Sequence, residues 1–76
     1  MKKYHLITYH PECDYDDKED VDTMEEATRL ANAYLNDMYD TIYVFNEEKR
    51  KLQRVFDQLS QRGRRPFDCE IKKFIP

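Results

Sequence analysis

The most regular pattern of apolar and polar positions lies in the first half of the chain. Seven apolar side chains recur there at spacings of three and four, which places them on one face of an α-helix. They are Met24, Ala27, Leu30, Ala31, Tyr34, Leu35 and Met38. Thr23 and Glu26 have the spacing of a capping box, and Glu25 adds negative charge where the helix dipole favours it. The pattern predicts an amphipathic helix over about 23–38.

A second set of apolar residues with helical spacing lies in the other half. Its members stand at positions i, i+3, i+4 and i+7, and they are Leu52, Val55, Phe56 and Leu59. Asn46 suits an N-cap before this set, and Gly63 suits the left-handed conformation that ends many helices. We therefore expect a helix over about 47–62. The alternative, a hairpin in which 49–56 is the return strand, is less favoured because polar side chains would share a face with Val55.

Three further segments have the composition of β-strands. Residues 3–10 are rich in aromatic and β-branched side chains, and 41–45 is an unbroken run of such residues. In 67–75 apolar and charged residues alternate at first, as in a strand with one buried face. The segment 11–22, between the first strand and the first helix, is too charged to pack and is expected to be an acidic loop.

These elements follow one another in the order β-α-β-α-β. Connections between parallel strands are nearly always right-handed, so the simplest arrangement places both amphipathic helices on one face of a three-stranded sheet. We expect residues 1–76 to form a single small domain of the α+β or small α/β class.

The composition excludes several classes of enzyme. Gly63 is the only glycine among the 76 residues, whereas phosphate-binding loops of the P-loop and Rossmann types need several. Ser60 is the only serine, and no nucleophile-elbow sequence surrounds it. We expect a protein that is not an enzyme and that uses no cofactor.

Cysteine and histidine leave metal-dependent or thiol chemistry as the alternative to a non-enzymatic role. Cys13 and Cys69 form no CxxC motif, and the spacing of His10 and Cys13 supplies only half of a zinc site. We therefore assign no metal site and expect both thiols to be reduced. The sequence has no signal-peptide pattern and no apolar run of membrane-spanning length, which indicates a cytoplasmic protein.

The net charge of −3 conceals a strong asymmetry along the chain. Residues 1–40 hold 4 basic and 11 acidic side chains, a net of −7. Residues 41–76 hold 9 basic and 5 acidic side chains, a net of +4. A chain with two such poles either neutralises itself on folding or presents two electric fields to its partners.

The acidic pole favours a non-enzymatic interaction or regulatory protein, with another protein as the expected partner and no membrane contact. Closely spaced carboxylates imitate a phosphate backbone and can occupy a basic surface. The predicted contact residues are Asp14, Asp16, Asp17, Glu19 and Asp20, with Tyr43 and Phe45 as apolar anchors on an open face of the sheet. Such an uncovered face would also favour homodimerisation. Small charged chains of this kind are common among phage and mobile-element products, although no motif supports that origin here.

The basic pole supports a different function, that of a small nucleic-acid-binding domain. The candidate contacts lie on the predicted second helix and just after it, and they are Arg50, Arg54, Arg62, Arg64 and Arg65. Arginine neutralises phosphates, and aromatic strand residues stack on bases. The sequence pI of about 5.3 argues against this alternative, because the acidic pole would repel the same ligand.

Overall fold

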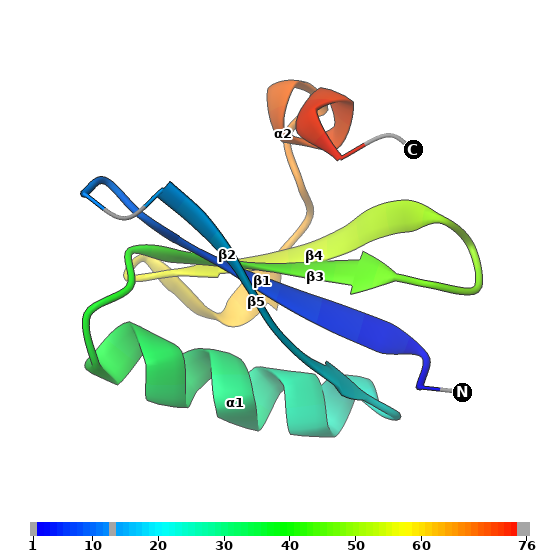
Figure 1. Cartoon of the computed structure of the whole chain (residues 1–76), viewed down its shortest axis with the longest axis horizontal. Coiled ribbons are helices and arrows are strands. Elements are labelled where there is room, and N and C mark those ends of the chain that lie inside the picture. Colours follow the sequence, from blue (N-terminus) through cyan, green and yellow to red (C-terminus); the bar gives the residue numbers. More distant parts are fainter. Residues whose placement is uncertain (1, 13, 75–76) are drawn as a thin grey trace.

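The computed structural model describes residues 2–12 and 14–74, and these form one antiparallel sheet with a helix on either face (Figure 1). In chain order the elements are β1 (Tyr4–His10), β2 (Asp14–Val21), α1 (Met24–Asn36), β3 (Thr41–Asn46), β4 (Lys51–Asp57), β5 (Ser60–Arg64) and α2 (Asp68–Lys73). The sheet has five strands in the order β2-β1-β3-β4-β5. The expected three-stranded sheet with two helices on one face is therefore wrong, whereas the broader α+β character agrees with the structure.

The larger part of the core lies between the sheet and α1. The side chains buried there are Tyr4, Leu6, Val21, Ala27, Ala31, Leu35, Ile42, Val44 and Phe56. β1 and β3 contribute alternate residues, because successive side chains of a strand point to opposite faces. The N–H of Glu26 donates a hydrogen bond to Thr23 Oγ1 (3.1 Å), so α1 begins at the cap expected from the sequence.

The expectation of an acidic loop over 11–22 is wrong for most of this segment, because Asp14–Val21 forms the strand β2. This strand pairs with β1 in antiparallel register, with Tyr15 opposite Tyr9 and Val21 opposite Tyr4. Aspartate is a poor strand former. The strand therefore depends on backbone hydrogen bonds to β1, a partner that the local charge pattern does not reveal.

The expected helix over 47–62 is wrong, since the chain turns back after β3 and continues as β4 and β5. The less favoured alternative, a hairpin with a return strand over 49–56, agrees with the pairing of β3 and β4. Asn46 does accept a hydrogen bond from the Lys49 N–H through its side-chain oxygen (2.9 Å), as an N-cap would. Arg50 then adopts a positive φ of 56°, and the chain returns along β3. The N-cap signal thus marks a single turn and not a helix.

A β-bulge in β4 explains the helical spacing of its apolar residues. Val44 and Phe45 are adjacent in β3, but their partners Arg54 and Leu52 are two residues apart, so β4 contains one extra residue. The bulge places Leu52 and Val55 on the same face of the sheet although they are three residues apart. A spacing of three therefore arises here in a strand.

The strand expected over 67–75 is replaced by the short helix α2, and residue 75 lies outside the described part of the chain. The strand pattern places Glu70 in water, but this residue is only 9% exposed. Its carboxylate accepts a hydrogen bond from the Phe67 N–H (2.8 Å) and so satisfies a backbone group at the start of the helix. Glu70, a charged residue that the alternating pattern assigns to the solvent side, therefore faces the interior.

α2 lies on the face of the sheet opposite α1 (Figure 1). A second, smaller apolar cluster occupies this face and is formed by Ile7, Tyr9, Tyr43, Leu52, Val55 and Phe74. Tyr43 is only 5% exposed as a result. The open aromatic face expected from the sequence is therefore covered at this residue.

Candidate functional site

The five acidic residues singled out in the sequence lie together on β2, at one edge of the sheet. We call them the acidic strand; they are Asp14, Asp16, Asp17, Glu19 and Asp20, and all five are exposed. Within the described sheet β2 pairs with β1 alone, so the other side of its backbone faces outward. The acidic strand thus combines dense negative charge with a free sheet edge.

His5 of β1 neutralises part of this charge on the face opposite α1. Its Nδ1 lies 2.6 Å from Asp20 Oδ1, and its Nε2 lies 3.0 Å from Asp17 Oδ1. A bulge in β2 brings these two carboxylates, three residues apart, to the same ring. Partial burial lowers the pKa of His5, but the hydrogen bonds and charges of Asp17 and Asp20 outweigh it, so the pKa is raised above its ordinary value of 6.5. The ring is held toward its cationic form.

Lys18 and Tyr34 hold two other carboxylates of the acidic strand, toward α1. The Lys18 Nζ lies 2.8 Å from Asp16, and this hydrogen-bonded ion pair, followed by the bond to Tyr39, raises the pKa of Lys18. The Tyr34 hydroxyl donates to Glu19 Oε1 at 3.1 Å. These contacts orient the side chains of the acidic strand but leave it with a net negative charge.

One group of residues in the described chain could hold a metal ion. The ligand atoms of His5, Asp20 and Glu47 lie within 4.8 Å of one another. Both ring nitrogens of His5 are hydrogen-bonded to carboxylates, so a metal would have to displace a proton and one of these bonds. The geometry is that of an ion pair, and we assign no metal to it. The zinc half-site considered for His10 and Cys13 includes a residue, Cys13, outside the described part of the chain.

The two predicted aromatic anchors differ in accessibility. Tyr43 is packed against Phe74, whose ring centroid is 4.8 Å away, and burial raises the pKa of its hydroxyl to about 12. Phe45 is half-buried, and the Arg50 guanidinium lies over its ring at 5.9 Å. Phe45 is also separated from the acidic strand by β1. The structure therefore does not combine the anchors and the carboxylates into one surface.

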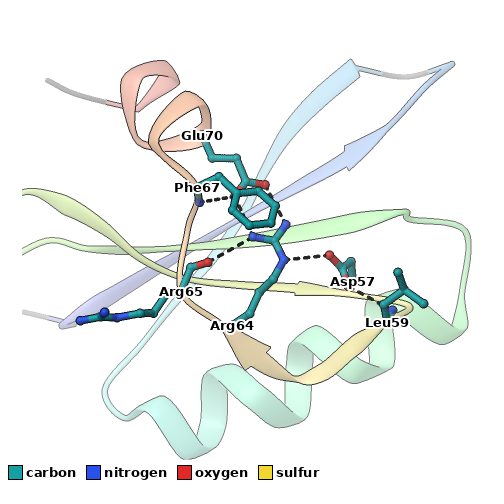
Figure 2. A network of polar contacts seen from close by, with 6 residues as sticks. All are labelled: Asp57, Leu59, Arg64, Arg65, Phe67 and Glu70. Atoms are coloured by element: carbon teal, nitrogen blue, oxygen red, sulfur yellow. Dashed lines mark hydrogen bonds and ion pairs between the residues drawn. The ribbon is translucent and has the colours of Figure 1, made fainter.

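Arg64, one of the predicted nucleic-acid contacts, is bound within the protein. Figure 2 shows its guanidinium at the centre of a polar network. It donates two hydrogen bonds to the Glu70 carboxylate (2.8 and 2.9 Å) and one to Asp57 (3.1 Å). The Phe67 ring centroid lies 4.2 Å from the same guanidinium. These contacts join α2 to the β4–β5 hairpin, so the charge of Arg64 is already matched.

Arg64 and four other basic residues, in or next to β4 and β5, line a pocket of about 640 Å³ between β4, the end of β5 and α2. We call this the basic pocket; its cationic side chains other than Arg64 are Lys49, Lys51, Arg54 and Arg65. Asp68 is the one carboxylate among the described residues that line it. Arg50 and Arg62 do not belong to this lining, so the pocket brings together three of the five predicted basic residues, Arg54, Arg64 and Arg65.

Gly63 shapes the basic pocket. Its φ is +95°, and a Cβ at this position would overlap Arg54 Cδ and lie 2.7 Å from Arg54 Cγ and 2.9 Å from Phe56 Cε1. The missing side chain allows the Arg54 stem to lie against β5. β5 pairs with β4 only from Val55 to Asp57, so within the described chain the first residues of β4 have no strand partner on the side of the pocket.

The two lysines of the basic pocket could not be assigned from the expected helix. Successive residues of a helix are about 100° apart, so Lys49 and Lys51 would point to opposite sides of it. The turn from β3 into β4 instead brings both lysines to one pocket. What the sequence does indicate is a dense cluster of positive charge from 49 to 54, without the direction of each side chain.

Comparisons of this chain with protein-family models, with curated proteins and with solved structures found no match. In the described part of the chain, neither α1 nor α2 has the length and apolar character that a bilayer crossing requires. A functional proposal for this chain therefore depends on the geometry of its two charged surfaces.

Proposed function

We propose that this chain is a small non-enzymatic interaction protein whose acidic strand binds a basic, extended segment of a partner protein. The observation that carries the proposal is the position of β2, a free edge of the sheet that displays five exposed carboxylates. An extended peptide can add to such an edge as a further strand, with its main chain supplying affinity and its side chains supplying specificity.

The charge of the acidic strand would select the partner. Its carboxylates flank the edge on both faces, since Asp17 and Asp20 lie near His5 whereas Asp16 and Glu19 lie toward α1. Opposite charges on paired strands are favourable and like charges are unfavourable. We therefore expect a partner segment rich in Lys or Arg, and we expect acidic segments to be excluded.

The acidic strand is locally unfavourable, which supports a functional reason for its composition. Aspartate is depleted in strands, and closely spaced like charges repel one another. Charges on an edge strand do prevent aggregation, but a few of them suffice for that purpose. A segment that opposes its own conformation so strongly is typical of a binding site.

The environment of His5 supports binding over acid–base chemistry. A general base near neutral pH needs an unprotonated nitrogen, and both nitrogens of this ring are hydrogen-bonded to carboxylates. The raised pKa of His5 favours the imidazolium form. Its role in the proposal is to hold Asp17 and Asp20 in place.

The homodimer and the cytoplasmic location expected from the sequence rest on separate arguments. Pairing of two copies through β2 would place like charges opposite one another, so the proposal does not include a homodimer at this edge. The thiol of Cys69 is free and exposed, which suits a reducing compartment, and we keep the cytoplasm as the proposed location.

The test is an NMR titration of the isotope-labelled protein with a peptide of alternating Lys and Val residues. We expect the largest shifts at β2 amides, together with slower hydrogen exchange there, because the added strand protects the outward backbone groups. The matched control is the same peptide with N-methylated amides, which keeps the charge but cannot complete the ladder. Equal binding of both peptides would contradict strand addition.

Paired variants test the role of charge in the same titration. We expect Asp16→Asn with Asp17→Asn to weaken peptide binding about tenfold, since each lost cross-strand charge pair is worth up to roughly 1 kcal/mol. The control, Glu25→Gln with Glu48→Gln, changes the net charge equally at exposed positions outside β2 and should alter affinity less than about twofold. An equal loss in both variants would show attraction by net charge alone and would contradict the proposal.

A further inference from the structure

We propose that the basic pocket is a second binding site, which holds the phosphates of a single-stranded nucleic acid. The pocket lies on the β4–β5 side of the sheet, whereas the acidic strand lies at the other edge. The proposal therefore goes beyond the binding of a basic partner and stands or fails separately from it.

The first argument is the imbalance of charge in the pocket. Its four cationic side chains, Lys49, Lys51, Arg54 and Arg65, form no ion pair with a carboxylate of the described chain. Asp68 is the one opposing charge in the described lining. Cations gathered in a concave surface focus a positive field and attract an anionic ligand. Arg64, the fifth cationic residue of the lining, is by contrast paired with Asp57 and Glu70, as Lys18 outside the pocket is paired with Asp16.

The second argument is the shape of the site. A volume of about 640 Å³ is that of a pocket for a nucleotide-sized group and not for a single ion. The Arg64–Glu70 pair holds α2 in position and so keeps one wall of the pocket in place. The free edge of β4 beside the pocket leaves room for an extended chain to continue beyond it.

The third argument concerns the bases. Phe67 is 59% exposed, and it connects Pro66 and Asp68, both of which line the pocket. Figure 2 shows its ring lying over the Arg64 guanidinium, 4.2 Å from the ring centroid to the guanidinium carbon. A flat aromatic group supported in this way, next to a positive groove, is the combination that binds single strands by stacking. An acidic peptide would make no use of Phe67, and paired bases would not present their faces to it.

The experiment is a fluorescence anisotropy titration of the whole chain with a labelled oligothymidylate of about ten nucleotides, a length within the usual site size of such domains. We expect salt-dependent binding with a slope of about −3 in log K against log salt, because each of four phosphate contacts to a single strand contributes about −0.7. A duplex, a nucleoside triphosphate and a polyglutamate peptide are titrated as competitors.

Paired variants locate the binding. We expect Lys51→Gln with Arg65→Gln to reduce the slope by about 1.4 and to weaken binding at least about tenfold at low salt. The control, Arg29→Gln with Arg62→Gln, removes the same charge at exposed residues outside the pocket and should weaken binding less than about threefold. We expect Phe67→Ala to weaken binding by about fivefold with an unchanged slope, because stacking does not release counterions.

Several results would overturn the proposal. They are no binding at low salt, equal losses in the pocket variant and its control, or tighter binding of the duplex, the triphosphate or the polyglutamate than of the single strand. The double variant Asp16→Asn with Asp17→Asn distinguishes the two proposals, since it should weaken peptide binding at β2 about tenfold and leave or improve binding of the oligonucleotide. A loss of oligonucleotide affinity in this variant would also contradict a separate site.

Discussion

Gly63 occupies a backbone conformation and a space that no other residue would fit. A side chain here would be strained at φ +95° and would overlap the Arg54 stem and the buried ring of Phe56. We expect Gly63→Ala to lower the free energy of unfolding by roughly 1–3 kcal/mol, the usual cost of backbone strain and overpacking. Urea denaturation measures this loss. Gln61→Ala, at an exposed position of the same strand, is the control and should change stability little; equal losses would contradict the explanation.

His5 links the stability of the protein to pH. It faces Asp17 and Asp20 of β2 and lies near Glu47 after β3. Because its pKa in the folded state is raised above 6.5, the stabilisation is complete below that pH and is lost as the pH rises through the folded-state pKa. We expect His5→Gln to remove this fall in the free energy of unfolding, measured by urea denaturation across pH. An NMR titration of the ring that gives a pKa at or below 6.5 would contradict it.

At the scale of elements, the stability of the six-residue helix α2 depends on the ion pair between its Glu70 and Arg64 of β5. Glu70 binds the Arg64 guanidinium twice and also accepts the Phe67 N–H. Isolated helices of this length are unstable in water, so the contact with β5 decides whether the helix forms. The pKa of Glu70 is lowered, first by its hydrogen bonds with Arg64, which shows that the ionised form is the one held.

We expect Glu70→Ala to release α2 and to reduce the free energy of unfolding by about 2 kcal/mol, the order of a charged hydrogen-bonded contact. Phe74 would then leave Tyr43, so the pKa of that tyrosine should fall from about 12 toward its ordinary value of 10. Ultraviolet titration and hydrogen exchange measure the two effects. Lys72→Ala, an exposed change on the same helix, is the control; an unchanged Tyr43 in Glu70→Ala would show that α2 is held by other contacts.

The elements also differ in how far the sequence could predict them. α1 was accessible because its cap and its apolar stripe are both local: Thr23 bonds to Glu26 within one turn. β4 is predicted only as the less favoured alternative, because the bulge opposite Val44 and Phe45 gives Leu52 and Val55 the spacing of a helix. β2 was missed for a third reason, since its backbone partner β1 outweighs the poor strand propensity of its side chains.

At the scale of the whole molecule, the two charged halves of the chain are placed at opposite edges of one sheet. The order β2-β1-β3-β4-β5 puts the acidic strand at one end and the β4–β5 hairpin with the basic pocket at the other. The poles therefore do not neutralise each other, and each ion pair of the described chain joins residues of the same half. The molecule can present two separate fields, and this separation underlies the two binding proposals.

The sequence by itself determined the separation of charge, the helix α1, the strands at 3–10 and 41–45, and the names of the acidic residues. These features depend on composition or on contacts within a few residues of the chain. Only the tertiary structure decided that the acidic segment is an edge strand, that Arg64 is matched by Glu70, and that Lys51, Arg54 and Arg65 share a pocket. The physical reason is that strand pairing and ion pairing join residues far apart in the chain, and their partners are defined only once the sheet has formed.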